Sequence, residues 1–143
     1  MIMSIYKEEY KNVIAVTNRK LSSRPFLEQM ERVCKLHPRA VILRENSENP
    51  GDFLAVGCSV HSVEEAKEAQ KLGATYLTAG HIYTTDCKKG LPPRGLDFLR
   101  EICNAVTIPV YAIGGIHAGT RQIQEVMDCG ASGACIMSEM MRI

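Results

Sequence analysis

The sequence VTIPVYAIGGIHAG, residues 106–119, decides the fold. Pro109 ends the helical pattern before it, because its ring has no N–H donor and biases its neighbour toward extended geometry. Residues Val110 to Ile113 form a short apolar run without polar alternation, typical of a strand buried on both faces of a parallel sheet. Gly114 and Gly115 follow at the C-terminal end of that strand, where ligands bind in parallel α/β folds.

The two glycines make this strand end a candidate phosphate cradle. Without side chains, Gly114 and Gly115 allow backbone N–H groups to approach a ligand closely. A helical pattern begins near Thr120, and the positive end of a helix favours an anion. The alternative is an ordinary tight turn between a strand and a helix, which the two glycines alone do not exclude.

The composition describes one globular domain. The chain has 143 residues, of which 45% are hydrophobic and 23% charged, typical of a soluble protein with a sizeable core. A formal charge of +1 and a pI near 7.6 show no bias toward nucleic acid or an anionic membrane. No apolar run reaches the roughly 18 residues of a membrane span. Acidic residues replace the basic start of a signal peptide, so a cytoplasmic location is expected.

Cysteine spacing argues against disulfides and metal sites. None of the six cysteines forms a Cys-x-x-Cys pair, and no metal-ligand spacing links them to the four histidines. We therefore expect buried free thiols in a reducing compartment. These cysteines are Cys34, Cys58, Cys87, Cys103, Cys129 and Cys135.

Strand and helix patterns alternate along the chain, which predicts parallel βαβ units. Ser62 and Glu65 form a capping box that opens one helix, and Gly73 ends it. Apolar runs predict buried strands at Val13–Thr17, Ala40–Leu43, Leu54–Val60, Tyr76–Gly80, Val110–Ile113 and Gly133–Met137. Helical faces are predicted from Phe26, Leu27, Met30, Val33 and Cys34; from Val63, Ala66 and Ala69; from Leu96, Leu99, Cys103 and Val106; and from Ile123, Val126 and Met127.

One connection departs from this alternation of strands and helices. The loop-like segment between Glu45 and Leu54 has no helical pattern, although a parallel crossover normally needs a dozen or more residues. Its extended length permits a closed ring of strands as well as an open one, and both remain alternatives.

Four ordered motifs at strand ends resemble the thiamine phosphate synthase / thiazole tautomerase family. They are VGCSVHS (residues 56–62), GHIYTTDCKKG (80–90), AIGGI (112–116) and GACIMS (133–138). The resemblance implies a parallel α/β TIM-barrel-like fold truncated to about six strands. It identifies the strands as numbers 1, 2, 5, 6, 7 and 8 of the barrel. The third and fourth βα units and the C-terminal helix are then missing from a single domain, residues 1–143, with a deletion junction at about 45–54.

The resemblance also implies a set of substrate-binding residues. Gly114, Gly115 and Ser138 match positions that hold the thiazole phosphate, in agreement with the phosphate cradle predicted above. Lys88 matches a lysine that contacts pyrophosphate, and a lysine supplies a point charge and three donors. Arg44 is a further pyrophosphate contact. The substrate-binding set is completed by Ser59 and Thr85.

His61 is the catalytic candidate. It ends a buried strand and precedes a helix start, which disfavours the charged ring and leaves a neutral imidazole able to act near pH 7. In the tautomerase branch the equivalent histidine moves a proton on the thiazole ring. A hydrogen-bonded structural histidine is the alternative. His81 is expected to position its loop and His117 to lie in a surface loop.

Two features favour tautomerase chemistry, a proton shift on the thiazole carboxylate phosphate with His61 as acid/base and no cofactor. The residue pairs Gly80-His81 and Asp86-Cys87 look more like the tautomerase than the synthase. The synthase also needs acidic ligands for Mg²⁺ on its pyrophosphate substrate. Those acids come from the third and fourth strands, which appear deleted.

Two other functions remain alternatives. One is thiamine phosphate synthase, which transfers hydroxymethylpyrimidine from its pyrophosphate to the thiazole phosphate. The other is a catalytically degenerate ligand-binding or regulatory protein. In each case the partner is the small-molecule thiazole phosphate, with no nucleic acid or membrane. Strands 2 and 5 would present bare edges, which a homodimer would cover.

Overall fold

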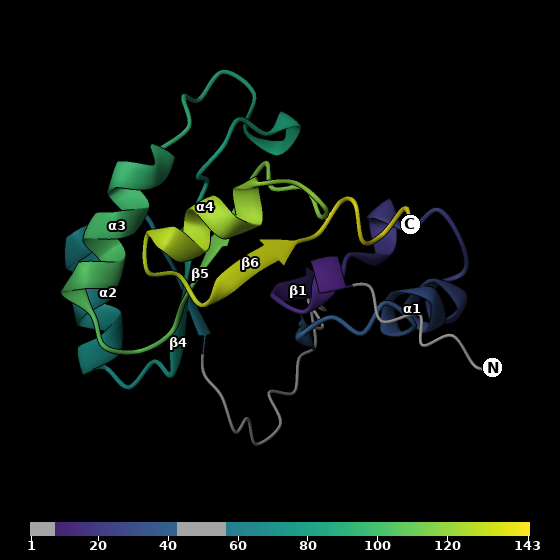
Figure 1. Ribbon diagram of the computed structural model, residues 1–143, viewed down its shortest axis with the longest axis horizontal. Helices are drawn as coiled ribbons and strands as arrows, with labels where there is room; N and C mark the ends of the chain where they lie inside the picture. The colour runs from purple at the N-terminus through teal and green to yellow at the C-terminus, as the bar shows by residue number, and fades with distance from the viewer. Residues whose placement is uncertain (1–7, 43–56) are drawn as a thin grey trace.

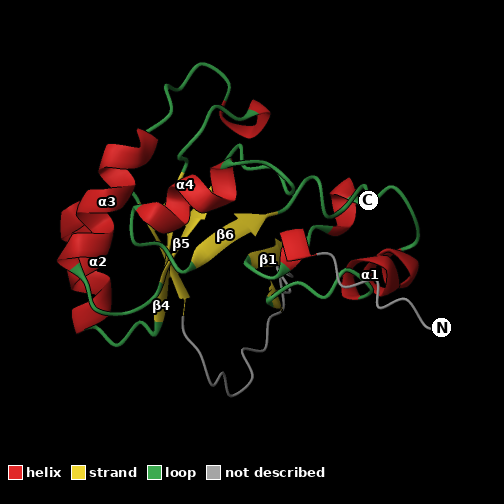
Figure 2. Ribbon diagram, viewed as in Figure 1, coloured by secondary structure: helices red, strands yellow, loops and turns green. Residues whose placement is uncertain are grey.

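The computed structural model describes residues 8–42 and 57–143. Six parallel strands alternate with four α-helices in this part of the chain (Figures 1 and 2). The strands are β1 (Val13–Val16), β2 (Ala40–Ile42), β3 (Gly57–Val60), β4 (Tyr76–Gly80), β5 (Val110–Ile113) and β6 (Gly133–Ile136). The helices are α1 (Phe26–Cys34), α2 (Val63–Lys71), α3 (Gly95–Ala105) and α4 (Gln122–Asp128), with 3₁₀ turns at Glu8–Tyr10, Arg19–Leu21 and Asp86–Lys88. The deletion junction predicted at about 45–54 lies outside the described residues.

The strands form one curled sheet in the order β2-β1-β6-β5-β4-β3. This is the order that barrel strands 2, 1, 8, 7, 6 and 5 would have, so the truncated TIM-barrel-like fold is confirmed. Strands β2 and β3 lie at opposite edges and do not pair with each other among the described residues, so the sheet is open there. The homodimer that would cover these edges stays a prediction.

Helices cover the convex face of the sheet. Figure 1 shows α2 and α3 side by side at one end, α4 over β5 and β6, and α1 at the opposite end. Alternation along a strand explains which residues they cover. Val13 and Ala15 of β1 belong to the main core beneath the helices. Ile14 and Val16 turn to the concave face, where they cluster with Tyr111 and Cys135. The concave face therefore has its own smaller apolar cluster.

Burial of the strands follows their place in the sheet. All four residues of β1 and of β6 are buried, as the apolar runs predict. The prediction of buried strands is wrong for β2 and β3, in which Ala40 and three of the four β3 residues are exposed. In a complete barrel their neighbours would be the third and fourth strands, which are absent from the described residues. The apolar runs are typical of strands with a neighbour on each side, whereas β2 and β3 are edge strands of the described sheet.

Helix α1 buries only part of the predicted face: Val33 belongs to the core and Met30 packs against it. Its buried residues are Gln29 and Val33, whereas Leu27 is 79% exposed and Cys34 is exposed. The prediction of buried thiols is also wrong for Cys58, which lies on the open edge strand, and correct for Cys129 and Cys135. A residue on the correct stripe is buried only where another element covers it.

The predicted start and end of α2 are confirmed. The Glu65 N–H donates to Ser62 Oγ at 3.1 Å, which confirms Ser62 as the N-cap; the Glu65 carboxylate completes the box one residue earlier than usual, accepting from the His61 N–H at 2.7 Å. Gly73 follows α2 with φ of +102°. None of the helices among the described residues is long and apolar enough to cross a membrane.

Candidate functional site

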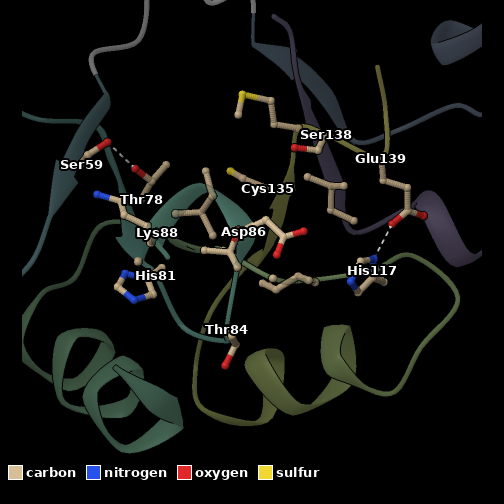
Figure 3. Close-up of a pocket in the computed structure, with 18 of the residues that line it drawn as sticks. Ser59, Thr78, His81, Thr84, Asp86, Lys88, His117, Cys135, Ser138 and Glu139 are labelled. Carbon is tan, nitrogen blue, oxygen red and sulfur yellow. Dashed lines mark hydrogen bonds and ion pairs between the residues drawn. The ribbon is translucent and has the colours of Figure 1, made fainter. Parts of the chain in front are cut away.

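A cavity of about 920 Å³ opens at the C-terminal end of the strands (Figure 3). Loops after β3, β4, β5 and β6 contribute to its lining. Seven of the residues proposed from sequence line this one cavity: Ser59, His61, Thr85, Lys88, Gly114, Gly115 and Ser138. The eighth, Arg44, lies outside the described residues. The strand ends therefore bring together residues that are up to 79 positions apart, from 59 to 138.

The two glycines after β5 allow a close contact between loops. Gly114 and Gly115 have φ values of +105° and +67°. A Cβ on Gly115 would overlap the carbonyl oxygen of Thr84, and one on Gly114 would overlap the His81 side chain. Tyr83 N–H donates to the Gly114 carbonyl at 3.0 Å. Glycine is thus required for packing as well as for any ligand contact.

The amide of Gly115 remains available to a ligand. Within the described part of the chain, the backbone N–H of Gly115 donates to no protein acceptor, whereas that of Gly114 faces β6 at the end of the ladder that pairs Ile113 with Cys135. Both residues line the cavity. A phosphate there would receive the Gly115 donor without displacing a protein hydrogen bond.

The helix after this loop contributes differently from the sequence-based expectation. Helix α4 begins at Gln122, close to the predicted start near Thr120, but several loop residues separate this start from Gly115. Its contribution is the Gln122 side chain, whose Nε2 donates to the Gly115 carbonyl at 3.0 Å while Oε1 accepts from the His117 N–H at 2.9 Å. A side-chain amide therefore holds the loop in place.

Ser138 lies on a well-anchored segment after β6. Met140 and Met141, which follow it, are fully buried. The Gln29 side chain of α1 donates from Nε2 to the Met140 carbonyl at 2.8 Å. Arg24 donates to the Ile143 carbonyl at 2.8 Å. These contacts fix the backbone on the C-terminal side of Ser138.

A side-chain contact connects the β5–α4 loop with the segment after β6. His117 Nδ1 lies 3.1 Å from Glu139 Oε2, so the β5–α4 loop contacts the segment after β6 (Figure 3). His117 is exposed, as expected for a surface loop, but it also lines the cavity. Glu139 was missed by sequence reasoning, because nothing in its local pattern shows that it reaches a residue 22 positions earlier.

His61 lies at the rim of the cavity. Its side chain is 50% exposed, and Nδ1 lies 3.5 Å from Glu65 Oε2. The His61 carbonyl accepts a hydrogen bond of 2.8 Å from Arg94 Nη1. The turn is therefore fixed through its backbone, while the ring stays open to solvent.

A second group of polar residues lies across the cavity from Ser138. The hydroxyls of Ser59 and Thr78 are 2.8 Å apart. His81 Nε2 lies 3.0 Å from the Pro92 carbonyl, a contact that fits the expected loop-positioning role. Figure 3 shows Lys88 on this side, with Ser138 and Glu139 on the other. Thr78 was missed, although a threonine in the apolar run YLTAG was a signal.

The floor of the cavity is apolar. Ile113, Ile136 and Met137 line it together with Cys135. Burial raises the pKa of the Cys135 thiol to about 12, which keeps the sulfur protonated near neutral pH. The cysteine therefore acts as an apolar side chain here and does not supply a nucleophile. An apolar floor beneath polar walls suits a flat ring that carries an anionic group.

The described residues do not form a protein metal site. Among them, no group of three or more histidine, cysteine, aspartate or glutamate side chains could hold a metal ion. The acids expected from the third and fourth barrel strands have no counterpart in this part of the chain. The Mg²⁺ of the synthase is thus not matched by residues seen here.

Comparisons with known proteins agree with the four motifs. A family model described as thiamine monophosphate synthase matches residues 48–140. The thiamine-phosphate synthase of Pyrococcus horikoshii is 47% identical over 88 residues, which cover 62% of this chain and 42% of that protein. That of Clostridium acetobutylicum is 42% identical over 83 residues, covering 58% and 38%. The chain thus spans less than half the length of these relatives.

Solved structures agree on the architecture. A thiamine phosphate pyrophosphorylase from Pyrococcus furiosus superimposes with a TM-score of 0.60 at 26% identity, covering 93% of this chain and 89% of that one. A nitroalkane oxidase from Streptomyces ansochromogenes gives a TM-score of 0.51 at 22% identity, covering 90% of this chain and 34% of that one. The second likeness concerns the fold alone.

Proposed function

The chain belongs to the thiamine monophosphate synthase family, and from this we propose that it acts in thiamine biosynthesis as a thiamine phosphate synthase. The reaction joins hydroxymethylpyrimidine, carried by a pyrophosphate, to a thiazole phosphate. The observation that carries the proposal is the gathering of the six described binding candidates and the catalytic candidate His61 around one cavity with an apolar floor.

The relatives favour the synthase over the tautomerase. The proteins of Pyrococcus and Clostridium reported above are all named as synthases or the equivalent pyrophosphorylase. Their similarity outweighs the tautomerase-like residues around His81 and Asp86. We therefore favour thiamine phosphate synthase, the alternative, over thiazole tautomerase, which the sequence alone favoured.

Each wall of the cavity has a role in this proposal. Gly115 donates its backbone N–H group to the thiazole phosphate, and Ser138 adds a hydroxyl from the next strand end. Lys88 supplies positive charge to the pyrophosphate, which leaves when the pyrimidine is transferred. The apolar floor holds the two rings between these anions. No step is assigned to a metal ion, because the described residues do not fit one.

The test is the formation of thiamine phosphate by the purified full chain. Both substrates are supplied, with and without Mg²⁺, and the product is measured by chromatography. Lys88→Ala should raise the KM for the pyrimidine pyrophosphate about tenfold, from the loss of a charged contact. Lys67→Ala, an exposed lysine on α2, is the matched control and should leave the KM unchanged.

Other outcomes would contradict the proposal. A proton shift on the thiazole carboxylate phosphate, without use of the pyrimidine substrate, would restore the tautomerase. Binding of the thiazole phosphate with no turnover under either condition would indicate a degenerate ligand-binding protein.

A further inference from the structure

A pair of hydroxyl groups bridges the last two strands of the open edge. Ser59 in β3 and Thr78 in β4 are register partners in the parallel sheet. Their side-chain oxygens, Oγ and Oγ1, are 2.8 Å apart, a normal O–H···O hydrogen bond. Both residues line the cavity. Ser59 is exposed and Thr78 half-buried, so the pair lies where a ligand can reach it.

The pair lies on the same side of the cavity as Lys88 (Figure 3). Figure 3 shows Ser59, Thr78 and Lys88 together on one side, and Ser138, His117 and Glu139 on the opposite side. A ligand with two anionic ends would therefore meet different groups at each end. The Lys88 side offers two hydroxyls and an ammonium group, whereas the opposite side offers the Ser138 hydroxyl, the His117 ring and the Glu139 carboxylate.

Hydrogen-bond accounting limits what the pair can do. Each hydroxyl has one proton, and one of the two protons is used within the pair. The other remains directed away from the pair, and the internal bond polarises it, which strengthens it as a donor. A donor of this kind next to an ammonium group suits the oxygen of a phosphate or pyrophosphate.

We infer that Thr78 is a positioning residue, which orients the Ser59 hydroxyl toward the pyrophosphate end of the substrate. The inference rests on the proposed function, because it takes Lys88 and Ser59 as the contacts of that anion. Thr78 acts through Ser59 and not on the reacting atoms. Its β-branched side chain fits a strand, so valine can replace it at nearly constant shape without the hydroxyl.

The experiment compares two ligands on three forms of the full chain. Calorimetric titration measures the Kd of inorganic pyrophosphate and of thiazole phosphate for the wild type, Thr78→Val and Thr78→Ser. We expect Thr78→Val to raise the Kd of pyrophosphate about fivefold to tenfold, the effect of losing a hydrogen bond to an anion. The Kd of thiazole phosphate should change by less than about twofold, and Thr78→Ser should bind both ligands as tightly as the wild type does.

A second variant tests the link with Ser59. Ser59→Ala should weaken pyrophosphate by a similar factor, and combining it with Thr78→Val should add little, because both remove the same pair. Thr78→Ala replaces the valine variant if the latter does not fold, as judged by circular dichroism. Additive effects of the two substitutions would overturn the inference.

Two failures can be told apart. If the wild type makes thiamine phosphate and Thr78→Val binds pyrophosphate normally, or loses both ligands equally, the inference is wrong and the proposed function stands. If the wild type binds neither pyrophosphate nor thiazole phosphate, both are wrong.

Discussion

Nη1 of Arg94 lies 2.8 Å from the carbonyl oxygen of His61, and this hydrogen bond joins the start of α3 to the turn after β3. The Arg94 backbone N–H also donates to the His81 carbonyl at 3.0 Å. Its guanidinium lies 5.3 Å from the centre of the Phe98 ring. One residue therefore fixes both ends of the loop that carries Lys88.

Replacing Arg94 with alanine should loosen that loop. The loss of one hydrogen bond, about 1 kcal/mol, should increase local opening about fivefold. Limited trypsin digestion, followed by mass spectrometry of fragments cut after Lys88 or Lys89, measures the opening rate. Arg100→Ala is the control, since this exposed arginine of α3 pairs with Asp97. Equal cleavage in both variants would show that Arg94 does not hold the loop.

Gly115 should tolerate alanine much less well than Gly73 does. Both have positive φ, +67° and +102°, which costs an alanine about 1–2 kcal/mol. A Cβ at Gly73 meets nothing within 4 Å, whereas at Gly115 it would overlap the Thr84 carbonyl. Urea unfolding should therefore show a further loss of about 1–3 kcal/mol for Gly115→Ala. Equal losses would mean that the loop moves aside without cost.

Gln29 should stabilise both the fold and the segment after Ser138. It is fully buried, donates to the Met140 carbonyl at 2.8 Å and accepts from Arg24 Nη1 at 3.1 Å. Gln29→Ala leaves that carbonyl without its donor and opens a small void, so unfolding free energy should fall by about 2–4 kcal/mol. The exposed Gln124→Ala should change it by less than about 0.5 kcal/mol. A similar small effect at Gln29 would contradict its structural role.

Thiol reactivity should divide the described cysteines into two groups. Cys34 and Cys58 are exposed and should react rapidly with a thiol reagent at pH 8. Burial raises the pKa of Cys103 to about 11 and that of Cys135 to about 12, so few of their thiolates form at this pH. Mass spectrometry of the labelled peptides measures the order. Labelling of Cys135 as fast as Cys58 in the folded protein would contradict the buried floor.

Stability should fall at alkaline pH. Burial disfavours the thiolates of Cys103 and Cys135 and raises their folded-state pKa values to about 11 and about 12, above the ordinary value for a thiol. Above about pH 9 the unfolded chain releases protons that the folded chain retains, so rising pH favours unfolding. The contribution is complete below pH 9 and is lost as pH rises toward the folded values. Chemical denaturation at pH 8 and pH 10 should show lower stability at pH 10.

Local patterns predicted the elements well. The limits of β5, the capping box of Ser62 and Glu65, and the end of α2 at Gly73 all depend on residues close in sequence. Hydrogen bonds within a turn, and the period of apolar residues, are set by such neighbours. The same patterns, with the four motifs, also identified the fold and the family.

The burial of individual residues and the contacts between residues far apart in the sequence could be determined only from the tertiary structure. The exposure of β2 and β3 depends on strands that are not beside them, and the burial of Gln29 depends on the segment around Met140. The contacts of Ser59 with Thr78 and of His117 with Glu139 join residues 19 and 22 positions apart. The sequence alone determined the strand–turn–helix units and their order, because those depend on local geometry. Which side chains line the same cavity was determined only by the folded sheet. The C-terminal ends of its parallel strands lie side by side although they are far apart in the sequence, and local patterns do not specify this arrangement.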